Sequence, residues 1–98
     1  MNPSVSVIVP AYNEEVMIAG CLRALLCQDY DGPYEVVVVD NGSTDATAEV
    51  ARSFGDDRIR VVGEPRRGYV HALLRGVAEA RGEILAFTDA DTQVGRRW

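Results

Sequence analysis

The sequence of 98 residues predicts one α/β domain with a mainly parallel β-sheet. Two observations lead to this prediction. Short runs rich in β-branched residues alternate with turns and amphipathic helical segments, and no linker, low-complexity tract or short-period repeat interrupts the alternation. Strands and helices that alternate in this way form a sheet with right-handed crossovers and helices on its faces, which is a Rossmann-like arrangement.

The first unit starts with a strand at residues 5–9, which are rich in β-branched side chains. A helix should follow the Pro-Ala-Tyr turn at residues 10–12. Asn13 is expected to be its N-cap, with Glu14 and Glu15 favourably placed in the first turn. The inward face of this helix is expected to carry Ile18, Leu22, Leu25 and Leu26.

The second unit has a strand at residues 34–39 that is apolar on both sides, as a central parallel strand should be. Ser43 or Thr44 is expected to cap the helix that follows. The inward stripe of that helix should consist of Thr47, Val50, Ala51 and Phe54. Residues 59–62 then predict the third strand.

The third helix is expected to turn an apolar stripe inward, formed by Val70, Leu73, Leu74 and Val77. His71 would lie on the opposite, solvated face, and the helix would stop near Gly82. Residues 83–87 predict the fourth strand, and only a short tail to Trp98 follows it. Because parallel sheets are normally buried on both faces and do not leave an open edge, we expect residues 1–98 to be one partial domain, truncated on its C-terminal side.

The composition excludes several classes of protein. Fifteen acidic residues against ten basic ones give a formal net charge of −5, which argues against a nucleic-acid partner. The longest apolar run, residues 36–39, is far shorter than the roughly 20 residues of a membrane span, and no basic region opens the chain. We therefore expect no membrane segment in this chain and a soluble domain in the cytoplasm, or at the cytoplasmic face of a membrane if the parent protein has later membrane segments. Cys21 and Cys27 fall on different faces of the first helix, which indicates two buried thiols in a reducing compartment.

Polar residues gather after three of the four strands. In open α/β sheets, ligands bind outside the carboxyl ends of the strands, near the point where the strand order reverses. If the strand order is 3-2-1-4, one crevice would be surrounded by Tyr12, Asn13 and Glu14 after the first strand, Asp40 after the second, and Asp89 and Asp91 after the fourth.

The spacing of Asp89 and Asp91 suits a cation. Residues two apart in an extended or turning backbone point the same way, so both carboxylates can face one ion. Mg²⁺ typically uses one or two protein carboxylates together with substrate phosphates, and such an ion could bridge a diphosphate. The alternative is an ordinary acidic loop at the end of a strand.

Two further features have alternative interpretations. Asp40 begins an Asp-Asn-Gly-Ser sequence that forms turns without any function, or its carboxylate accepts a hydrogen bond from a base N–H. Arg66 and Arg67 precede the third helix and either contact a phosphate or base in the crevice or form a solvated surface pair.

Three segments in this order, VSVIVPAYNEE at 5–15, VVVDNGSTD at 37–45 and RGEILAFTDADT at 81–92, resemble the inverting glycosyltransferases of family two. The resemblance implies the N-terminal half of a GT-A fold and a nucleoside-diphosphate sugar as the ligand. It places Pro10, Ala11, Tyr12 and Glu14 in the nucleoside pocket and implies that Asp40 recognises the base.

The same resemblance places Asp89, Ala90 and Asp91 at the donor diphosphate. Asp89 would approach the ribose and the metal, and Asp91 would be the direct ligand of Mg²⁺ or Mn²⁺. Arg67 would be a further donor contact. The chain departs from the family pattern where Asn41 replaces a frequent second Asp, and where the third helix has two leucines in place of an Arg-Asn pair.

The resemblance implies that the catalytic base and the acceptor site belong to the second half of such a domain, so we expect this chain to bind a donor without completing transfer. A non-catalytic nucleotide-binding or self-association module that uses the uncovered sheet is the alternative. A dinucleotide-dependent oxidoreductase fits less well, because the loop after the first strand lacks G-x-G-x-x-G. A phospho-accepting receiver domain also fits less well, since its first loop is normally acidic.

Overall fold

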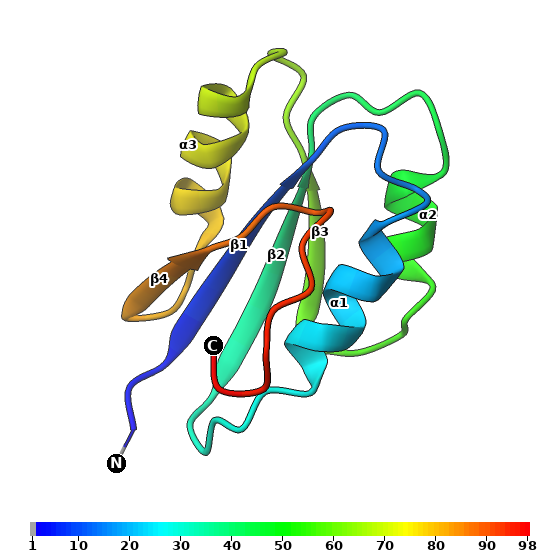
Figure 1. Cartoon of the computed structure of the whole chain (residues 1–98). Helices are drawn as coiled ribbons and strands as arrows, with labels where there is room; N and C mark the ends of the chain where they lie inside the picture. Colours follow the sequence, from blue (N-terminus) through cyan, green and yellow to red (C-terminus); the bar gives the residue numbers. More distant parts are fainter. Residues whose placement is uncertain (1) are drawn as a thin grey trace.

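The computed structural model describes residues 2–98. Four parallel strands form one sheet in the order β3-β2-β1-β4: β1 (Val5–Ala11), β2 (Tyr34–Asp40), β3 (Ile59–Gly63) and β4 (Ile84–Phe87). Three helices connect them: α1 (Ile18–Leu26), α2 (Thr47–Arg52) and α3 (Tyr69–Glu79) (Figure 1). The predicted fold class and strand order are confirmed.

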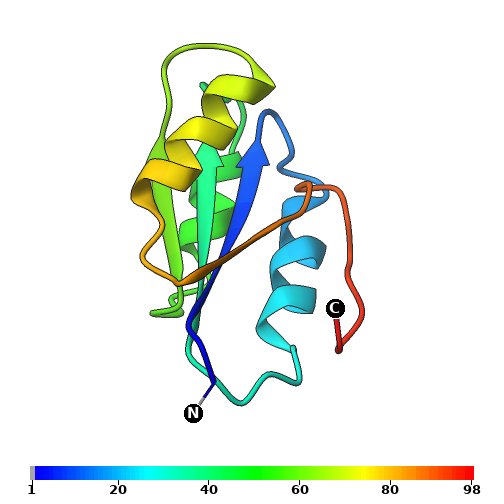
Figure 2. The same ribbon diagram turned by 90° about the vertical axis from the view of Figure 1, so that its left-hand side faces the viewer.

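The two central strands alternate their side chains between two layers. On one face, α1 and α2 cover a cluster that includes Val7, Val9, Val36 and Val38. On the other face, α3 covers a smaller cluster of Ile8, Val37, Val39 and Ala72. Figure 2 shows α1 and α3 on opposite sides of the sheet. The valine-rich β2 is therefore buried on both sides, as its sequence predicts.

The predicted inward face of α3 is wrong. The residues that α3 buries are Ala72 and Gly76, whereas the predicted stripe is largely in solvent, with Val70, Leu74 and Val77 exposed by 64%, 58% and 43%. Small residues let the helix lie close to the sheet, and a Cβ atom added at position 76 would overlap Cγ2 of Ile8 in β1. Close approach of the backbone thus decides which face is buried.

The loop between β1 and α1 also differs from the prediction. Asn13 does not cap the helix, because α1 begins only at Ile18 and Asn13 has a left-handed backbone with φ of 51°. The Asn13 side chain instead accepts a hydrogen bond from Thr44 N–H at 2.8 Å. The backbone N–H of Asn13 donates a hydrogen bond to Ser43 Oγ at 3.0 Å. Ser43 and Thr44 thereby fix this loop.

Neither Ser43 nor Thr44 caps α2. The helix begins at Thr47, whose N–H donates to Asp45 Oδ1 at 3.0 Å, and Thr47 Oγ1 accepts a hydrogen bond from Glu14 N–H at 2.8 Å. The predicted inward residues of α2 are confirmed, since Thr47 and Ala51 are buried and Val50 and Phe54 pack against the same cluster.

Two predictions about single side chains are corrected. Cys21 is buried beneath the loop after β4, but Cys27 is exposed, and both are free thiols. The difference arises because α1 ends at Leu26, so Cys27 lies beyond the face that packs on the sheet. His71 is half-buried rather than solvated, and its Nδ1 is shielded without a hydrogen-bond partner among residues 2–98.

The segment after β4 runs back along the α1 side of the sheet (Figure 1). Arg96 accepts a backbone hydrogen bond from Asp29 at 2.7 Å, and Gln28 Nε2 donates to the Gly95 carbonyl at 2.6 Å. β4 is an edge strand, and Leu85 and Phe87 in it are exposed. Within residues 2–98, no helix is both long enough and apolar enough to cross a bilayer.

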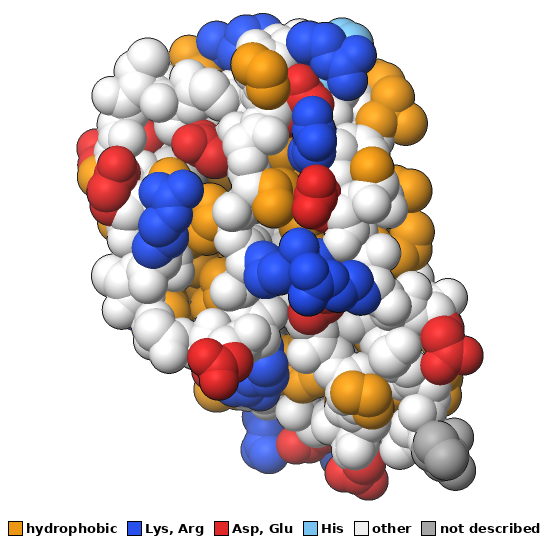
Figure 3. All heavy atoms as spheres, turned by 180° about the vertical axis from the view of Figure 1, so that it is seen from behind, with side chains coloured by type: hydrophobic (Ala, Val, Ile, Leu, Met, Phe, Trp, Pro, Cys, Tyr) orange, Lys and Arg blue, Asp and Glu red, His pale blue; other side chains and the backbone are white. Residues whose placement is uncertain are grey.

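A chain of ion pairs links β3 to α3. Arg75 Nε lies 3.2 Å from Glu64 Oε1, and Arg75 Nη1 lies 3.7 Å from Glu79 Oε2. Arg60 continues the chain with Nη1 at 3.5 Å from Glu79 Oε1 and Nε at 3.0 Å from Glu35 Oε1. Figure 3 shows alternating basic and acidic side chains on the face that carries α3. Glu64 is the buried member, with 1% of its surface exposed.

Glu64 is expected to make stability depend on acid pH. Hydrogen bonds from the backbone and side chain of Arg66, and from Arg75, lower the pKa of its carboxyl from 4.5 to about 2. Its contribution is fully present above its unfolded pKa and is lost as the pH falls towards 2. The urea midpoint of the Glu64→Gln variant should therefore fall less steeply than that of the wild type between about pH 5 and pH 2.5. The exposed Glu49→Gln variant is the control, and equal slopes for Glu64→Gln and wild type would contradict this prediction.

Candidate functional site

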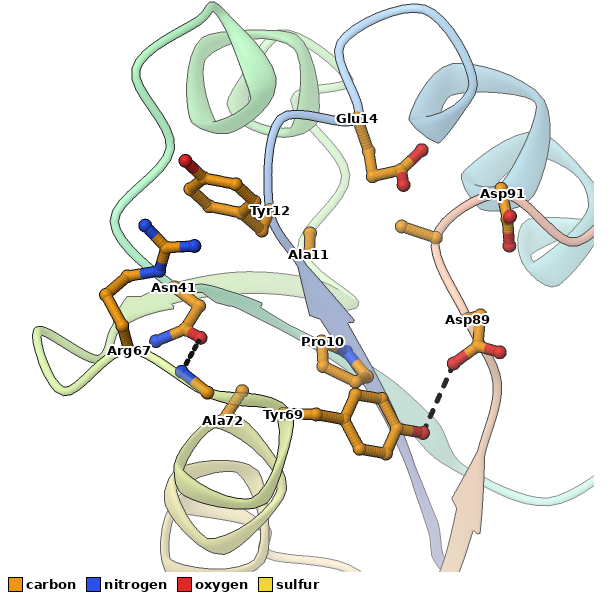
Figure 4. Close-up of a pocket in the computed structure, with 12 residues that line it drawn as sticks. Pro10, Ala11, Tyr12, Glu14, Asn41, Arg67, Tyr69, Ala72, Asp89 and Asp91 are labelled. Atoms are coloured by element: carbon orange, nitrogen blue, oxygen red, sulfur yellow. Dashed lines mark hydrogen bonds between the residues drawn. The ribbon is translucent and has the colours of Figure 1, made fainter.

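A pocket of about 430 Å³ opens at the carboxyl end of β1, between the N-terminal end of α3 and the loop after β4. This is the position that an open α/β sheet predicts for a ligand. Twelve residues line it (Figure 4): Pro10, Ala11, Tyr12, Glu14, Asn41, Arg67, Gly68, Tyr69, Ala72, Asp89, Ala90 and Asp91.

One end of the pocket is aromatic and cationic. The guanidinium carbon of Arg67 lies 3.6 Å from the centre of the Tyr12 ring, which is a stacked cation–π contact. In Figure 4 this pair lies on the side of the pocket away from the two aspartates. Arg67 thus lines the pocket while its side chain stays exposed, and its contact with a phosphate or base stays a prediction. A flat, partly polar group such as a nucleobase could pack against such a pair.

The other end of the pocket is acidic. Asp89 and Asp91 lie on the loop after β4, and Glu14 reaches towards them from the loop after β1 (Figure 4). Partial burial and then the carboxylates of Asp91, Asp45 and Asp89 raise the pKa of Glu14. Uncompensated negative charge therefore accumulates at this end, and a bound cation would relieve it.

Asp89 has a partner across the pocket. The Tyr69 hydroxyl, at the start of α3, donates a hydrogen bond to Asp89 Oδ1 at 3.2 Å. Beneath the loop, Cys21 Sγ lies 3.5 Å from the Asp89 carbonyl oxygen, and burial together with Asp91 and Asp89 raises the pKa of this thiol to about 11. Cys21 is consequently a protonated donor that supports the loop.

Like Asn13, Asp40 is expected around the crevice but does not line the pocket. Its Oδ1 accepts a hydrogen bond from Ser43 N–H at 3.1 Å, the arrangement of a turn-forming aspartate. The expected convergence of strand-end acids on one pocket thus holds for Glu14 after β1 and for Asp89 and Asp91 after β4, but not for Asp40 after β2. Recognition of a base by Asp40 stays a prediction.

Four lining residues had no predicted role there: Asn41, Gly68, Tyr69 and Ala72. Three of them come from the start of α3 and the loop before it, which follow the outer strand β3 and reach back over β1. Because β3 lies at the edge of the sheet, its position alone does not predict that the loop after it reaches the central crevice. The paired Arg66 and Arg67 were the only signal in this segment.

The strand order is that of the N-terminal portion of a GT-A domain, and the pocket lies where such a sheet binds its ligands. The chain belongs to glycosyltransferase family 2, because the sequence model described as "Glycosyl transferase family 2" matches residues 6–98. This confirms the resemblance that three short segments indicated.

The chain is similar to glycosyltransferases from several organisms. It is 42% identical over 100 residues to the glycosyltransferase AglE of Haloferax volcanii, covering 98% of this chain and 33% of that protein. A crystal structure of TarS from S. aureus in complex with UDP superposes with a TM-score of 0.88 at 32% identity, covering 96% of this chain and 29% of that one. The mannosyltransferase PcManGT from Pyrobaculum calidifontis, in complex with GDP-Man and Mn²⁺, gives a TM-score of 0.84 at 43% identity, covering 93% and 28%. The chain therefore spans about a third of the length of such relatives.

Proposed function

We propose that this chain is the donor-binding portion of a glycosyltransferase and holds a nucleoside-diphosphate sugar together with Mg²⁺ or Mn²⁺. The observation that carries the proposal is the division of one pocket into an end with Tyr12 and Arg67 and an end with Asp89 and Asp91. A base would occupy the first end and the diphosphate the second. The UDP complex of TarS and the GDP-Man and Mn²⁺ complex of PcManGT support a nucleotide sugar and a divalent cation as the ligands.

The residues at the acidic end fit a hard divalent cation. Asp89 and Asp91 offer carboxylate oxygens, which are the ligands that Mg²⁺ and Mn²⁺ prefer. Across the described part of the chain, no three His, Cys, Asp or Glu side chains are grouped to hold a metal. The protein would therefore supply a minority of the ligands, and the donor phosphates and water would complete the coordination.

In the proposed mechanism, the pocket binds and orients the donor. Asp91 holds the cation directly, and Asp89 faces the cation and the ribose. When bound, the cation neutralises the charge that grows on the departing diphosphate. Tyr12 and Pro10 provide apolar surface for the nucleoside, and the Arg67 guanidinium closes the pocket at that side.

The whole protein would transfer the sugar with inversion. An acceptor hydroxyl would attack the anomeric carbon from the face opposite the nucleotide, while a carboxylate base takes its proton. In this proposal, no residue of the pocket acts as the base that takes the acceptor proton. The residues described so far account for donor binding, and acceptor binding belongs to the remainder of the domain in this proposal.

Calorimetry with UDP, GDP and dTDP, each with and without Mn²⁺, tests donor binding. We expect saturable binding of at least one nucleotide in the presence of Mn²⁺ and clearly weaker binding without it, because the acidic end repels a bare diphosphate. The matching monophosphate is the control, and Mn²⁺ should strengthen its binding much less. A sample that is folded by circular dichroism and binds none of the three nucleotides would contradict the proposal.

A second candidate function is self-association through the face shared by α3 and β4. Val70, Leu74 and Val77 are exposed on the helix, and Leu85 and Phe87 are exposed on the strand. Phe87 pairs with Ile8, whose side chain packs under α3, so these apolar groups lie on one side of the sheet. Light scattering over a wide concentration range tests this role, and a strict monomer would exclude it.

A further inference from the structure

The side chain of Asn41 is fully engaged by a single loop. Asn41 directly follows β2 and has 4% of its surface exposed. Its Nδ2 donates hydrogen bonds to the carbonyl oxygens of Glu64 at 2.9 Å and Arg66 at 2.8 Å. Its Oδ1 accepts a hydrogen bond from Gly68 N–H at 3.0 Å. One buried amide thus holds the segment 64–68 at three points.

The buried carboxylate of Glu64 fixes the first half of the same loop. Glu64 Oε2 accepts hydrogen bonds from Arg66 N–H at 2.8 Å and Arg66 Nε at 3.3 Å, and Arg75 Nε contacts Oε1 at 3.2 Å. Within residues 2–98, the Glu64 carboxylate makes no hydrogen bond with Arg67 or Gly68. The second half of the loop therefore depends on Asn41.

That second half forms a wall of the pocket. Arg67 stacks on Tyr12 at 3.6 Å, and Gly68 adopts φ of 132°, a conformation that favours glycine, immediately before α3. Tyr69 then begins the helix and donates to Asp89 on the far side of the pocket. The hydrogen bond to Asn41 fixes the position of Gly68, and the position of Gly68 in turn determines where Arg67 and Tyr69 lie.

We infer that Asn41 is a positioning residue of the donor pocket, which acts through the 64–68 loop to place Arg67 against Tyr12. The inference rests on the proposed donor-binding function. The Asn41 amide also donates two hydrogen bonds that a carboxylate at this position could not make. An aspartate has no N–H to donate, and its charged oxygens would face the carbonyl oxygens of Glu64 and Arg66 in a buried site.

The test compares Asn41→Asp with wild type by two readouts, and Asn2→Asp is the matched control because Asn2 is exposed. The first readout is amide hydrogen exchange by NMR. In Asn41→Asp the Gly68 amide should lose its protection, while the amides of Val37 and Val38 in the core stay protected. The second is calorimetry, in which the Mn²⁺–nucleotide complex should bind at least about tenfold more weakly, since a buried partner left unpaired commonly has an effect of this size. Asn2→Asp should match wild type in both.

The outcomes separate this inference from the proposed function. A protected Gly68 amide, or unchanged nucleotide affinity in Asn41→Asp, would overturn the positioning role. If wild type itself binds no nucleotide, the donor-binding proposal fails and takes the pocket role of Asn41 with it, while Gly68 exchange still shows whether the loop is held. If Asn41→Asp does not fold, an NMR titration of the wild type with nucleotide tests the positioning role instead. The Gly68 amide, the Asn41 carboxamide and Arg67 Nε should shift together, and unshifted signals would overturn the inference.

Discussion

Replacement of Asp91 by Asn is expected to weaken binding of a nucleoside diphosphate in the presence of Mn²⁺ at least about hundredfold, because even outer-shell partners of metal ligands commonly account for ten- to hundredfold. Asp91 is exposed at the acidic end of the pocket, so its removal creates no cavity and should leave the fold intact. An amide at this position loses the charge that a divalent cation requires.

Without a metal ion, the same substitution should change the nucleotide affinity in the opposite direction. Asp91 is one of the carboxylates that crowd Glu14 and raise its pKa, and this group of acids repels a bare diphosphate. Asp91→Asn should therefore bind the metal-free nucleotide slightly more tightly than wild type. Calorimetry at matched ionic strength, with and without Mn²⁺, measures both effects. Exposed Asp57 lies outside the pocket, so Asp57→Asn is the control for loss of one charge. Equal weakening of Asp91→Asn under both conditions would contradict a role at the cation.

Much of the fold and part of the site follow from local sequence patterns. Short apolar runs place all four strands, and a parallel sheet brings their carboxyl ends to one edge, so Tyr12, Glu14, Asp89 and Asp91 could be assigned to one pocket. The spacing of Asp89 and Asp91 is a local property of one loop. Such features survive in any fold of this class and are visible without coordinates.

The rest depends on contacts between distant segments. Asn13 resembles an N-cap, but its hydrogen bond to Thr44 holds it in a loop, and no local pattern reveals that partner. Asn41 looks like a turn residue beside Gly42, although its side chain spans to Gly68. In both cases a residue with turn propensity is used by the tertiary structure for a long-range hydrogen bond.

The buried face of α3 was mispredicted for a related reason. A pattern of apolar residues predicts that the larger side chains face the core, but here the sheet is already filled by Ile8 and Val39. The helix can approach it only where Ala72 and Gly76 present little volume. Two helical glycines, Gly76 and Gly20, should therefore respond to alanine with opposite changes in stability.

Gly76→Ala should lower the free energy of unfolding by about 1 kcal/mol, the difference between an overpacking cost of about 2 kcal/mol and a gain of about 1 kcal/mol in helix propensity. The added Cβ would overlap Ile8 Cγ2 in the buried β1 and lie 3.3 Å from Val39 Cγ2, so α3 must move away from the sheet. This strain exceeds the gain of about 1 kcal/mol in helix propensity that alanine brings over glycine. Urea unfolding measures the change. Because α3 also carries Tyr69 and Ala72 at the pocket, nucleotide affinity should fall with stability.

Gly20→Ala is the matched substitution, in the first turn of α1, and should raise the free energy of unfolding by about 0.5 kcal/mol. A Cβ there would lie 2.6 Å from Gln93 Nε2, nominally also too close. Gln93, however, is exposed, and Nε2 is the far end of its flexible side chain, so it can swing into solvent. The helix propensity of alanine then decides the sign. If both alanines destabilise equally, rigid contact with the sheet is not what selects glycine at position 76, and the explanation for the buried face of α3 fails.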